Sequence, residues 1–240
     1  MRIYLPNPSS RMSIRVRAFS RNFKLKVIVE RGVVRKPLKL VMLGDGSPDD
    51  VMVAIVANHL DGGEVVALVK PEVPREAGIV DALHAWTRVE VSGVLAILDQ
   101  ETTSVDEVMR AFEDRLRVSG VRFERRAKRG RVATYACSIG PSRFEVILVV
   151  NGLEEQYIRH TVEDHFLEAA KRSTLRKVVE EALRRTRRDP KRAWSLLGEK
   201  RGEVFGRLVK DPRLAERSFP QQFKAFRGLL REAMDAGLAP

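Results

Sequence analysis

The sequence predicts an open, mostly parallel α/β sheet with helices on both faces and a helical C-terminal region. Continuously apolar segments of strand length alternate with segments of helical pattern through the first two thirds of the chain. This alternation is typical of parallel sheets, because helices cover both faces of each strand. From about Thr161 onward the pattern is helical throughout. With 240 residues, of which 44% are hydrophobic, the chain is long enough to bury a substantial core.

The N-terminal residues 1–37 are predicted to form a basic arm followed by a strand. Residues 1–20 are rich in arginine, and we expect a loose arm in which Met12 could serve as an alternative start. The segment Phe23–Glu30 begins with alternating apolar and basic residues, and this period of two is typical of a half-exposed strand.

The first buried strand is predicted at Leu38–Leu43, and the glycines around Asp45 indicate a tight turn after it. Ser47 is the expected N-cap of the next helix, with Pro48 at the first helical position. This helix should end near Leu60. The elements that follow are a strand at Glu64–Val69, a helix over 75–87 and a buried strand at Val91–Leu98.

A capping box at Ser104–Glu107 predicts the start of an amphipathic helix. Residues 121–138 then read as a basic hairpin, and Phe144–Val150 as another buried strand. The inner face of the helix is formed by Val108, Met109, Phe112 and Leu116. The chain is thereby divided into the arm and strand (1–37), an α/β domain (38–165) and a basic helical C-terminal region (166–240).

The net charge of +12 is distributed unevenly along the chain. Lys and Arg outnumber Asp and Glu by ten in residues 1–40 and again by ten in residues 171–240. Acidic residues are in excess by seven in residues 41–100. An acidic centre between two basic ends is the pattern of a polyanion-binding protein with a metal site, so nucleic acid, DNA or RNA, is the expected partner.

Several classes are excluded by what the sequence lacks. No apolar run approaches the ~20 residues of a membrane span. The N-terminus also lacks the apolar stretch of a secretion signal, so we expect a cytoplasmic protein with no membrane partner. The single cysteine, Cys137, excludes an internal disulfide, and the four histidines lack zinc-ligand spacing.

Four carboxylates follow two of the predicted strands. Asp45 and Asp50 come after the first buried strand, and Asp99 and Glu101 come after the third. If these strands are neighbours in a parallel sheet, the four side chains converge at the edge where such sheets bind ligands. Because like charges repel and all the ligands are oxygens, their convergence would favour Mg²⁺ or Mn²⁺.

Both acidic segments resemble the motifs of the Toprim domain. This family includes primases, type IA and type II topoisomerases, OLD-family nucleases and ribosomal RNA maturases, and it has a first strand ending in Glu-Gly and a third ending in Asp-x-Asp. Residues 43–51 (Leu-Gly-Asp-Gly-Ser-Pro-Asp-Asp-Val) resemble the first motif, with Asp45 in place of the glutamate. Residues 97–101 (Ile-Leu-Asp-Gln-Glu) resemble the second, with Glu101 in place of the last aspartate.

A third segment extends the resemblance over roughly residues 38–165. Residues 161–164 (Thr-Val-Glu-Asp) resemble a Thr-Leu-Glu-Asp segment that follows the last strand in uncharacterised archaeal and bacterial Toprim-like proteins. This match adds Glu163 to the candidate site residues. The helical C-terminal tails of those proteins are also similar to residues 166–240.

The resemblance implies a Mg²⁺-dependent nucleic-acid-processing protein, such as a phosphodiester-cleaving nuclease. Asp99 and Glu101 would hold Mg²⁺ or Mn²⁺ against the phosphodiester, with Asp50 as a supporting ligand. Asp45 would be the general acid or base. Flanking phosphates would be bound by basic side chains of the hairpin and the C-terminal region, namely Arg125, Arg126, Lys128, Arg129, Arg184, Arg185, Arg187 and Arg188.

Plainer interpretations stay open beside these. Helix capping alone explains Asp49 and Asp50, and a solvated surface explains the arginine clusters. A non-catalytic module that keeps the fold and binds nucleic acid is the main alternative function. A receiver-like phospho-acceptor would need a suitably placed lysine after a later strand, and we find none in the sequence. The oligomeric state is left open.

Overall fold

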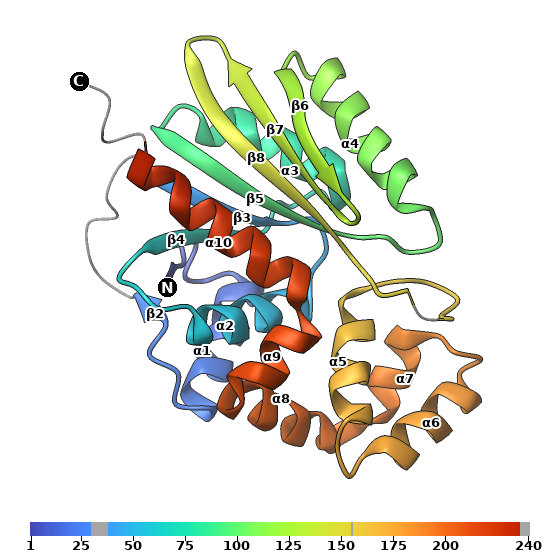
Figure 1. Cartoon of the computed structure of the whole chain (residues 1–240). Helices are drawn as coiled ribbons and strands as arrows, with labels where there is room; N and C mark the ends of the chain where they lie inside the picture. The colour runs from blue at the N-terminus through green and yellow to red at the C-terminus, as the bar shows by residue number, and fades with distance from the viewer. Residues whose placement is uncertain (30–37, 155, 236–240) are drawn as a thin grey trace.

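Eight strands form one sheet in the order β2-β1-β4-β3-β5-β8-β7-β6 in a computed structural model that describes residues 1–29, 38–154 and 156–235 (Figure 1). The strands from β2 to β8 in this order run parallel, and β7 and β6 complete the sheet as an antiparallel hairpin. This confirms the predicted fold class. The strands are β1 (Arg2–Tyr4), β2 (Ile28–Val29), β3 (Leu38–Leu43), β4 (Val65–Val69), β5 (Val91–Asp99), β6 (Arg122–Arg129), β7 (Val132–Ile139) and β8 (Ser142–Asn151).

Helices cover both faces of the sheet. On one face Leu40 and Met42 of β3 belong to a core cluster with residues of α3 (Arg75–Trp86) and α4 (Val105–Val118). On the other face Val41 of the same strand belongs to a second core cluster, which includes residues of the remaining helices. Because alternate strand residues point to opposite faces, two covered faces explain the continuously apolar strands. The remaining helices are α1 (Arg11–Asn22), α2 (Asp49–His59), α5 (Val162–Lys171), α6 (Arg176–Arg185), α7 (Pro190–Leu196), α8 (Arg201–Lys210), α9 (Pro212–Ser218) and α10 (Pro220–Asp235).

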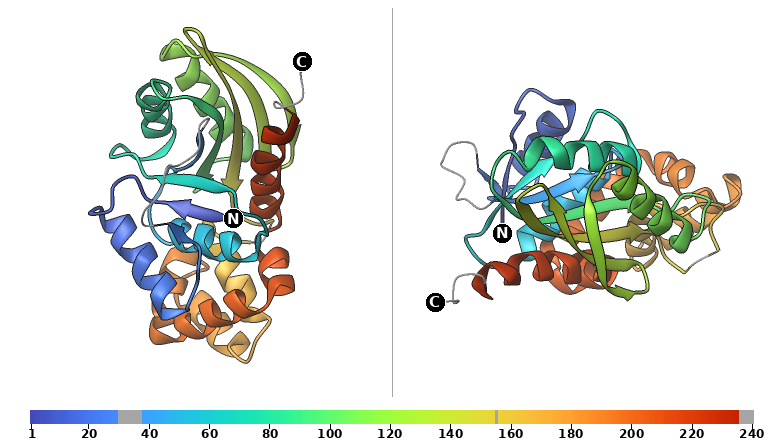
Figure 2. Two further views of the ribbon diagram at one scale, coloured as in Figure 1. Left: turned by 90° about the vertical axis from the view of Figure 1, so that its left-hand side faces the viewer. Right: turned by 90° about the horizontal axis from the view of Figure 1, so that it is seen from above.

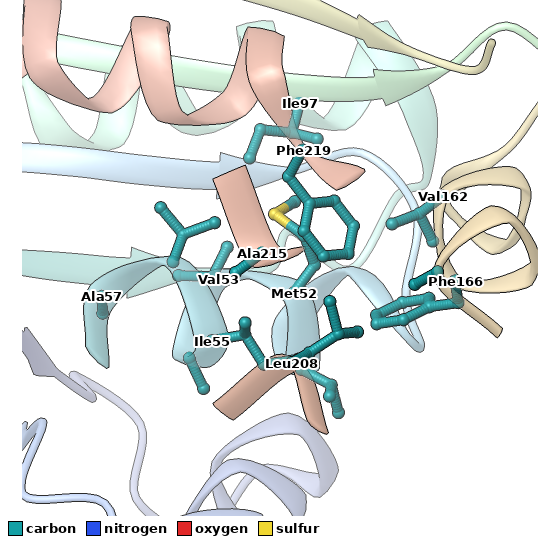
Figure 3. Close-up of a cluster of buried hydrophobic side chains, with 14 of the residues drawn as sticks. Met52, Val53, Ile55, Ala57, Ile97, Val162, Phe166, Leu208, Ala215 and Phe219 are labelled. Atoms are coloured by element: carbon teal, nitrogen blue, oxygen red, sulfur yellow. The ribbon is translucent and has the colours of Figure 1, made fainter. Parts of the chain in front are cut away.

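Helix α2 is apolar on nearly all sides because it lies between the sheet and the C-terminal helices. Every residue from 51 to 57 is buried. Figure 3 shows Met52 of α2 gathered with Phe166 of α5, Leu208 of α8 and Phe219, which lies between α9 and α10. A helix that is hydrophobic all round is a buried helix, and α2 therefore anchors the loop of residues 44–48, between β3 and α2, to the core.

The C-terminal helices belong to the same hydrophobic core as this face of the sheet. Helix α10 runs along β5 and β8 (Figures 1 and 2). Its close approach requires glycine in β5, because a Cβ on Gly93 would lie 2.9 Å from Leu229 of α10. The predicted C-terminal region 166–240 is thus helical as expected over its described part, and residues 236–240 lie outside the described residues.

The prediction of a loose arm over residues 1–20 is wrong. Strand β1 pairs with β2 and β4 inside the sheet, and α1 follows it. Met12, Val16 and Phe19 are buried at helical spacing, so α1 is amphipathic with its arginines on the other faces. The Ser10 hydroxyl caps the helix by accepting a hydrogen bond from the Ser13 amide at 3.1 Å.

The strand predicted at Phe23–Glu30 is present only as Ile28–Val29. Phe23 instead packs against Phe19 and Phe205, with ring centroids 4.7 and 6.3 Å away. Glu30 and the remainder of the predicted N-terminal region up to residue 37 lie outside the described residues.

The start of α2 also differs from the prediction. Pro48, not Ser47, occupies the N-cap position, and no side chain caps the helix there. The capping box of α4 is confirmed: the Ser104 hydroxyl accepts from the Glu107 amide at 3.2 Å, and the Glu107 carboxylate accepts from the Ser104 amide at 2.7 Å.

None of the helices in the described segments has both the length and the apolarity needed to cross a membrane.

Candidate functional site

The loop after β3 (residues 44–48) and the loop after β5 (residues 100–104) meet at one edge of the sheet, because β3 and β5 are adjacent and parallel. We call them the first and the second acidic loop. The register pairs Leu43 with Ile97, so the residues after each strand leave the sheet side by side. The amide of Asp99 donates a hydrogen bond to Asp45 Oδ2 at 3.3 Å. The structure therefore brings together Asp45 and Asp99, two of the four carboxylates that the sequence predicts to converge.

Asn151 at the end of β8 joins two further groups to this edge. Its amide nitrogen donates to Asp99 Oδ1 at 3.1 Å and to Asp49 Oδ1 at 2.7 Å. Gln222 of α10 in turn donates to Asn151 Oδ1 at 2.8 Å, which fixes the orientation of the amide. Sequence reasoning missed both Asn151 and Asp49, although Asn151 directly follows a predicted strand that ends at the same edge.

Asp99 is almost fully buried, and its neighbours make its charge costly. Its Oδ1 also accepts from the Val162 amide at the start of α5, at 3.1 Å. Burial, followed by the negative charges of Asp45 and Glu163, raises the pKa of Asp99 well above its ordinary value, against the opposing effect of Lys191. The edge therefore favours the uptake of a proton or a cation.

Asp49 shows the same effect from the neighbouring element. Burial and then the charges of Asp99 and Glu163 raise its pKa well above the ordinary aspartate value. We call Asp45, Asp49, Asp99 and Glu163 the carboxylate cluster. The carboxylates of this cluster raise one another's pKa values, and the charge of Lys191 opposes the effect at Asp99.

Glu163 in the first turn of α5 is 6% exposed, and its Oε2 is buried without a hydrogen-bond partner in the described part of the chain. Burial is the main cause that raises its pKa. A buried acceptor left unpaired is costly, so an unpaired oxygen at the edge of a ligand site marks a place where a donor or cation can bind.

Glu101 is held apart from the cluster by its own contacts. Its backbone has a φ of 58° and exchanges two 2.8 Å hydrogen bonds with the backbone of His160. Its carboxylate is paired with Arg159, 3.4 Å away, and with Lys191 of α7. Lys191 Nζ also lies 3.7 Å from Asp99 Oδ2. The lysine therefore stands between Asp99 and Glu101, the two carboxylates predicted to hold a metal ion.

The ammonium of Lys191 is stabilised in this position. Burial lowers its pKa, but the hydrogen bond to Glu101 and the charges of Asp99, Glu101 and Glu163 outweigh burial, so the pKa lies above the ordinary lysine value. Sequence reasoning missed this residue, because it lies in a helix far along the chain and no local pattern marks it.

Asp50 faces away from the cluster toward α1. Its Oδ2 pairs with Arg15 at 2.6 Å, and its Oδ1 accepts from the Val51 amide at 2.9 Å. Its carboxylate thus links α1 to α2, and the structure does not bring it against Asp99. Among the described residues, no three His, Cys, Asp or Glu side chains are arranged as a ready set of metal ligands.

The predicted phosphate-binding residues lie on two surfaces that flank this edge. The first, which we call the hairpin surface, consists of Arg125, Arg126, Lys128 and Arg129 of β6. Beyond its end, Arg131 in the turn donates to Gln100 of the second acidic loop at 2.6 Å. Arg126 and Arg129 are exposed; Arg125 is paired with Glu113 at 3.0 Å, and Lys128 with Asp106.

The second surface, which we call the α6–α7 turn, consists of the end of α6 and the residues between α6 and α7. Arg184, Arg185, Arg187 and Arg188 are exposed there, and they line two hollows of about 650 and 540 Å³. The turn is tied to the site, because Arg159 lies 3.4 Å from both Asp189 and Glu101. Arg184 is paired with Glu181, and the Arg188 guanidinium lies over the ring of Tyr157.

A scan against protein-family models found no matching family. Searches of curated proteins and of solved structures likewise found no match.

Proposed function

We propose that the chain is a Toprim-like, Mg²⁺-dependent nucleic-acid-processing protein that hydrolyses phosphodiester bonds in DNA or RNA. The observation that carries the proposal is the contact between Asp45 and Asp99 at the ends of two adjacent parallel strands. Open α/β sheets bind their ligands at this edge. The resemblance to the Toprim motifs assigns the same two positions to the reaction.

The donor set fits a hard divalent cation. The cluster and Glu101 offer only carboxylate oxygens, which Mg²⁺ and Mn²⁺ prefer. The unpaired Oε2 of Glu163 is a free acceptor beside them. Asp99 and Glu101 would hold the ion with help from Glu163, and Lys191 would give up its place between them. When bound, Mg²⁺ would polarise a phosphoryl oxygen and offset the charge that develops on it.

Each side chain then has a role that its surroundings support. Asp45 is the half-buried member of the cluster and can reach solvent, so we assign it the role of the general base that accepts the proton of the attacking water. The water oxygen forms the new bond to phosphorus, the leaving oxygen departs, and the proton passes through Asp45 to that oxygen. Lys191 and Arg159 place positive charge beside the phosphate.

The alternative is a non-catalytic nucleic-acid-binding module that keeps this fold. One observation favours it: the Lys191 ammonium is paired with both Asp99 and Glu101 and occupies the place between them. In that case the two basic surfaces would bind nucleic acid, and the acidic edge would be a structural ion-pair network.

Substitution of the two aspartates separates these functions. Asp45→Asn should reduce Mg²⁺-dependent cleavage of end-labelled single-stranded or duplex DNA and RNA by about 10²–10⁴-fold, because an amide cannot carry the proton. Nucleic-acid affinity should stay nearly unchanged. Asp99→Asn should lower both Mn²⁺ binding in calorimetry and cleavage. Asp81 of α3 is exposed, so Asp81→Asn is the matched control and should cleave like the wild type.

The alternative replaces the nuclease proposal under one clear result. If the wild type binds all four nucleic acids equally well in EDTA and in Mg²⁺ or Mn²⁺, yet cleaves none of them, the protein is a binding module.

A further inference from the structure

A cleft opens directly beside the carboxylate cluster. It lies between α1, the start of α2, α7 and α8, and its volume is about 640 Å³. Glu163 and Lys191 of the site described above are among its lining residues. This volume is within the range of ~300–1,000 Å³ that is typical of small-ligand sites, so the cleft is large enough for a single nucleotide.

Aromatic rings form one wall of the cleft. Phe23, which directly follows α1, and Phe205 of α8 are partly exposed, with ring centroids 6.3 Å apart at 84°. Behind them Trp194 packs edge-on against Phe205 at 5.5 Å. Because Trp194 is nearly buried, the wall is held rigidly by the core. Such rings provide a surface on which a nucleobase can stack.

Charged groups complete the cleft. Arg15, Lys191 and Arg201 come from three different helices and line the same space, where they can bind a phosphate. Glu163, whose Oε2 has no donor in the described structure, lines it as well. An unpaired acceptor, cations and aromatic rings together match a ligand that carries a hydroxyl or amino donor, a phosphate and a base.

We propose that this cleft binds the terminal nucleotide of a nucleic-acid strand, with its base against the aromatic wall and its phosphodiester beside the carboxylate cluster. The cleft has room for a single nucleotide, and we place the end of the strand there, so that the protein acts at strand ends. This inference rests on the proposed function, because it names the substrate geometry of the same site.

Mononucleotide binding tests the cleft without any need for catalysis. The chain has two tryptophans, of which Trp194 lines the cleft and Trp86 packs on the opposite face of the sheet. AMP or dAMP in EDTA should therefore quench tryptophan fluorescence saturably. The quenching should persist in Trp86→Phe. Inorganic phosphate and adenosine should each bind at least tenfold more weakly than AMP, because each lacks one half of the ligand.

A blocking variant is available within α8. Gly202 lines the cleft, and a Cβ built on it meets no atom within 4 Å, so the Cβ of Gly202→Leu is accommodated and the rest of the side chain adds bulk at the cleft. It should weaken AMP binding at least tenfold. Gly63→Leu is the matched control, since a Cβ there also meets no atom within 4 Å and the residue lies outside the cleft. The control should bind AMP like the wild type.

The outcomes also separate this inference from the nuclease proposal. AMP binding that Gly202→Leu abolishes, in a protein that cleaves nothing, supports the nucleotide cleft and removes the nuclease. Absence of AMP binding up to millimolar concentration overturns the inference, as does binding that Gly202→Leu leaves intact. Cleavage of circular single-stranded DNA as fast as linear DNA of the same sequence overturns end binding while leaving the nuclease in place.

Discussion

Asp164 is a buried carboxylate whose protonation couples folding to pH. It is fully buried at the start of α5. Its oxygens accept from the backbone amides of Thr161 and Leu153, both at 3.3 Å, and Oδ2 lies 3.0 Å from His160 Nδ1. Burial outweighs these hydrogen bonds and raises the pKa of Asp164 to about 7. Between about pH 4 and pH 7, Asp164 is therefore protonated in the folded state and ionised in the unfolded chain.

The sign of the pH dependence follows from this raised pKa. The stability that the proton contributes is fully present below the unfolded pKa and is lost as the pH rises through the folded pKa. The unfolding free energy of the wild type, relative to Asp164→Asn, should thus fall by about 2–4 kcal/mol between pH 4 and pH 8. Urea unfolding at several pH values measures it, with the exposed Asp81→Asn as the control. A difference that does not change with pH would contradict the prediction.

The two aspartates that open α2 show why the site could be predicted only in part. Asp49 and Asp50 are consecutive helical residues, and they point about 100° apart around the helix axis. Only one of them can face Asp99 and Asn151. Which one does so depends on where the helix begins, and the helix begins one residue later than the sequence predicts. In the structure Asp49 faces Asn151, and Asp50 faces Arg15.

Asp45 and Asp99 could be brought together from the sequence, because the ends of parallel strands share one edge of the sheet. Lys191 could not, since its approach to Glu101 depends on how α7 packs against the loops rather than on any local pattern. The same is true of Gln222, which reaches Asn151 from α10.

Hydrophobic periodicity in the sequence identified the central strands of the sheet and the helices that connect them. Strands β3, β4, β5 and β8 and helices α2, α3 and α4 were all expected close to their observed bounds. Their patterns are clear because each is buried on one or both sides. Helix α1 was missed because its exposed faces carry four arginines, which hide the spacing of Met12, Val16 and Phe19.

Two isoleucines near the N-terminus distinguish a packed segment from a loose arm. Ile3 in β1 is fully buried between neighbouring strands, whereas Ile14 in α1 is 56% exposed. Ile3→Ala should lower the unfolding free energy by about 2–5 kcal/mol, because it removes buried methyl groups and leaves a cavity. Ile14→Ala should change it by less than about 0.5 kcal/mol. Urea unfolding followed by circular dichroism compares them, and two equally small effects would restore the loose arm.

Across the whole molecule, charge is arranged around the acidic edge. The hairpin surface flanks it through Arg131, and the α6–α7 turn flanks it through Arg159. A nucleic acid that crosses the carboxylate cluster would therefore meet positive charge on both sides. The opposite ends of β6 and β8 carry arginines too, Arg122 and Arg143, but these lie at the other edge of the sheet.

Salt dependence of binding should report which arginines contact phosphates. Lys128→Ala with Arg129→Ala removes two charges from the hairpin surface, and Arg185→Ala with Arg187→Ala removes two from the α6–α7 turn. Each pair should weaken DNA binding and make the slope of log K against log salt shallower by about 1.8, because about 0.9 is lost for each duplex phosphate no longer neutralised. Fluorescence anisotropy of a labelled duplex at several salt concentrations measures both quantities.

The control pair is Arg122→Ala with Arg143→Ala, which changes the net charge by the same amount at the opposite edge of the sheet. If binding depends on where the charges lie, this pair should keep the slope of the wild type, since neither side chain flanks the carboxylate cluster. A general attraction between a protein of charge +12 and a polyanion would instead make all three pairs equivalent. Equal slopes for the three double variants would therefore contradict a nucleic-acid path across the acidic edge, even if the affinity of each were reduced.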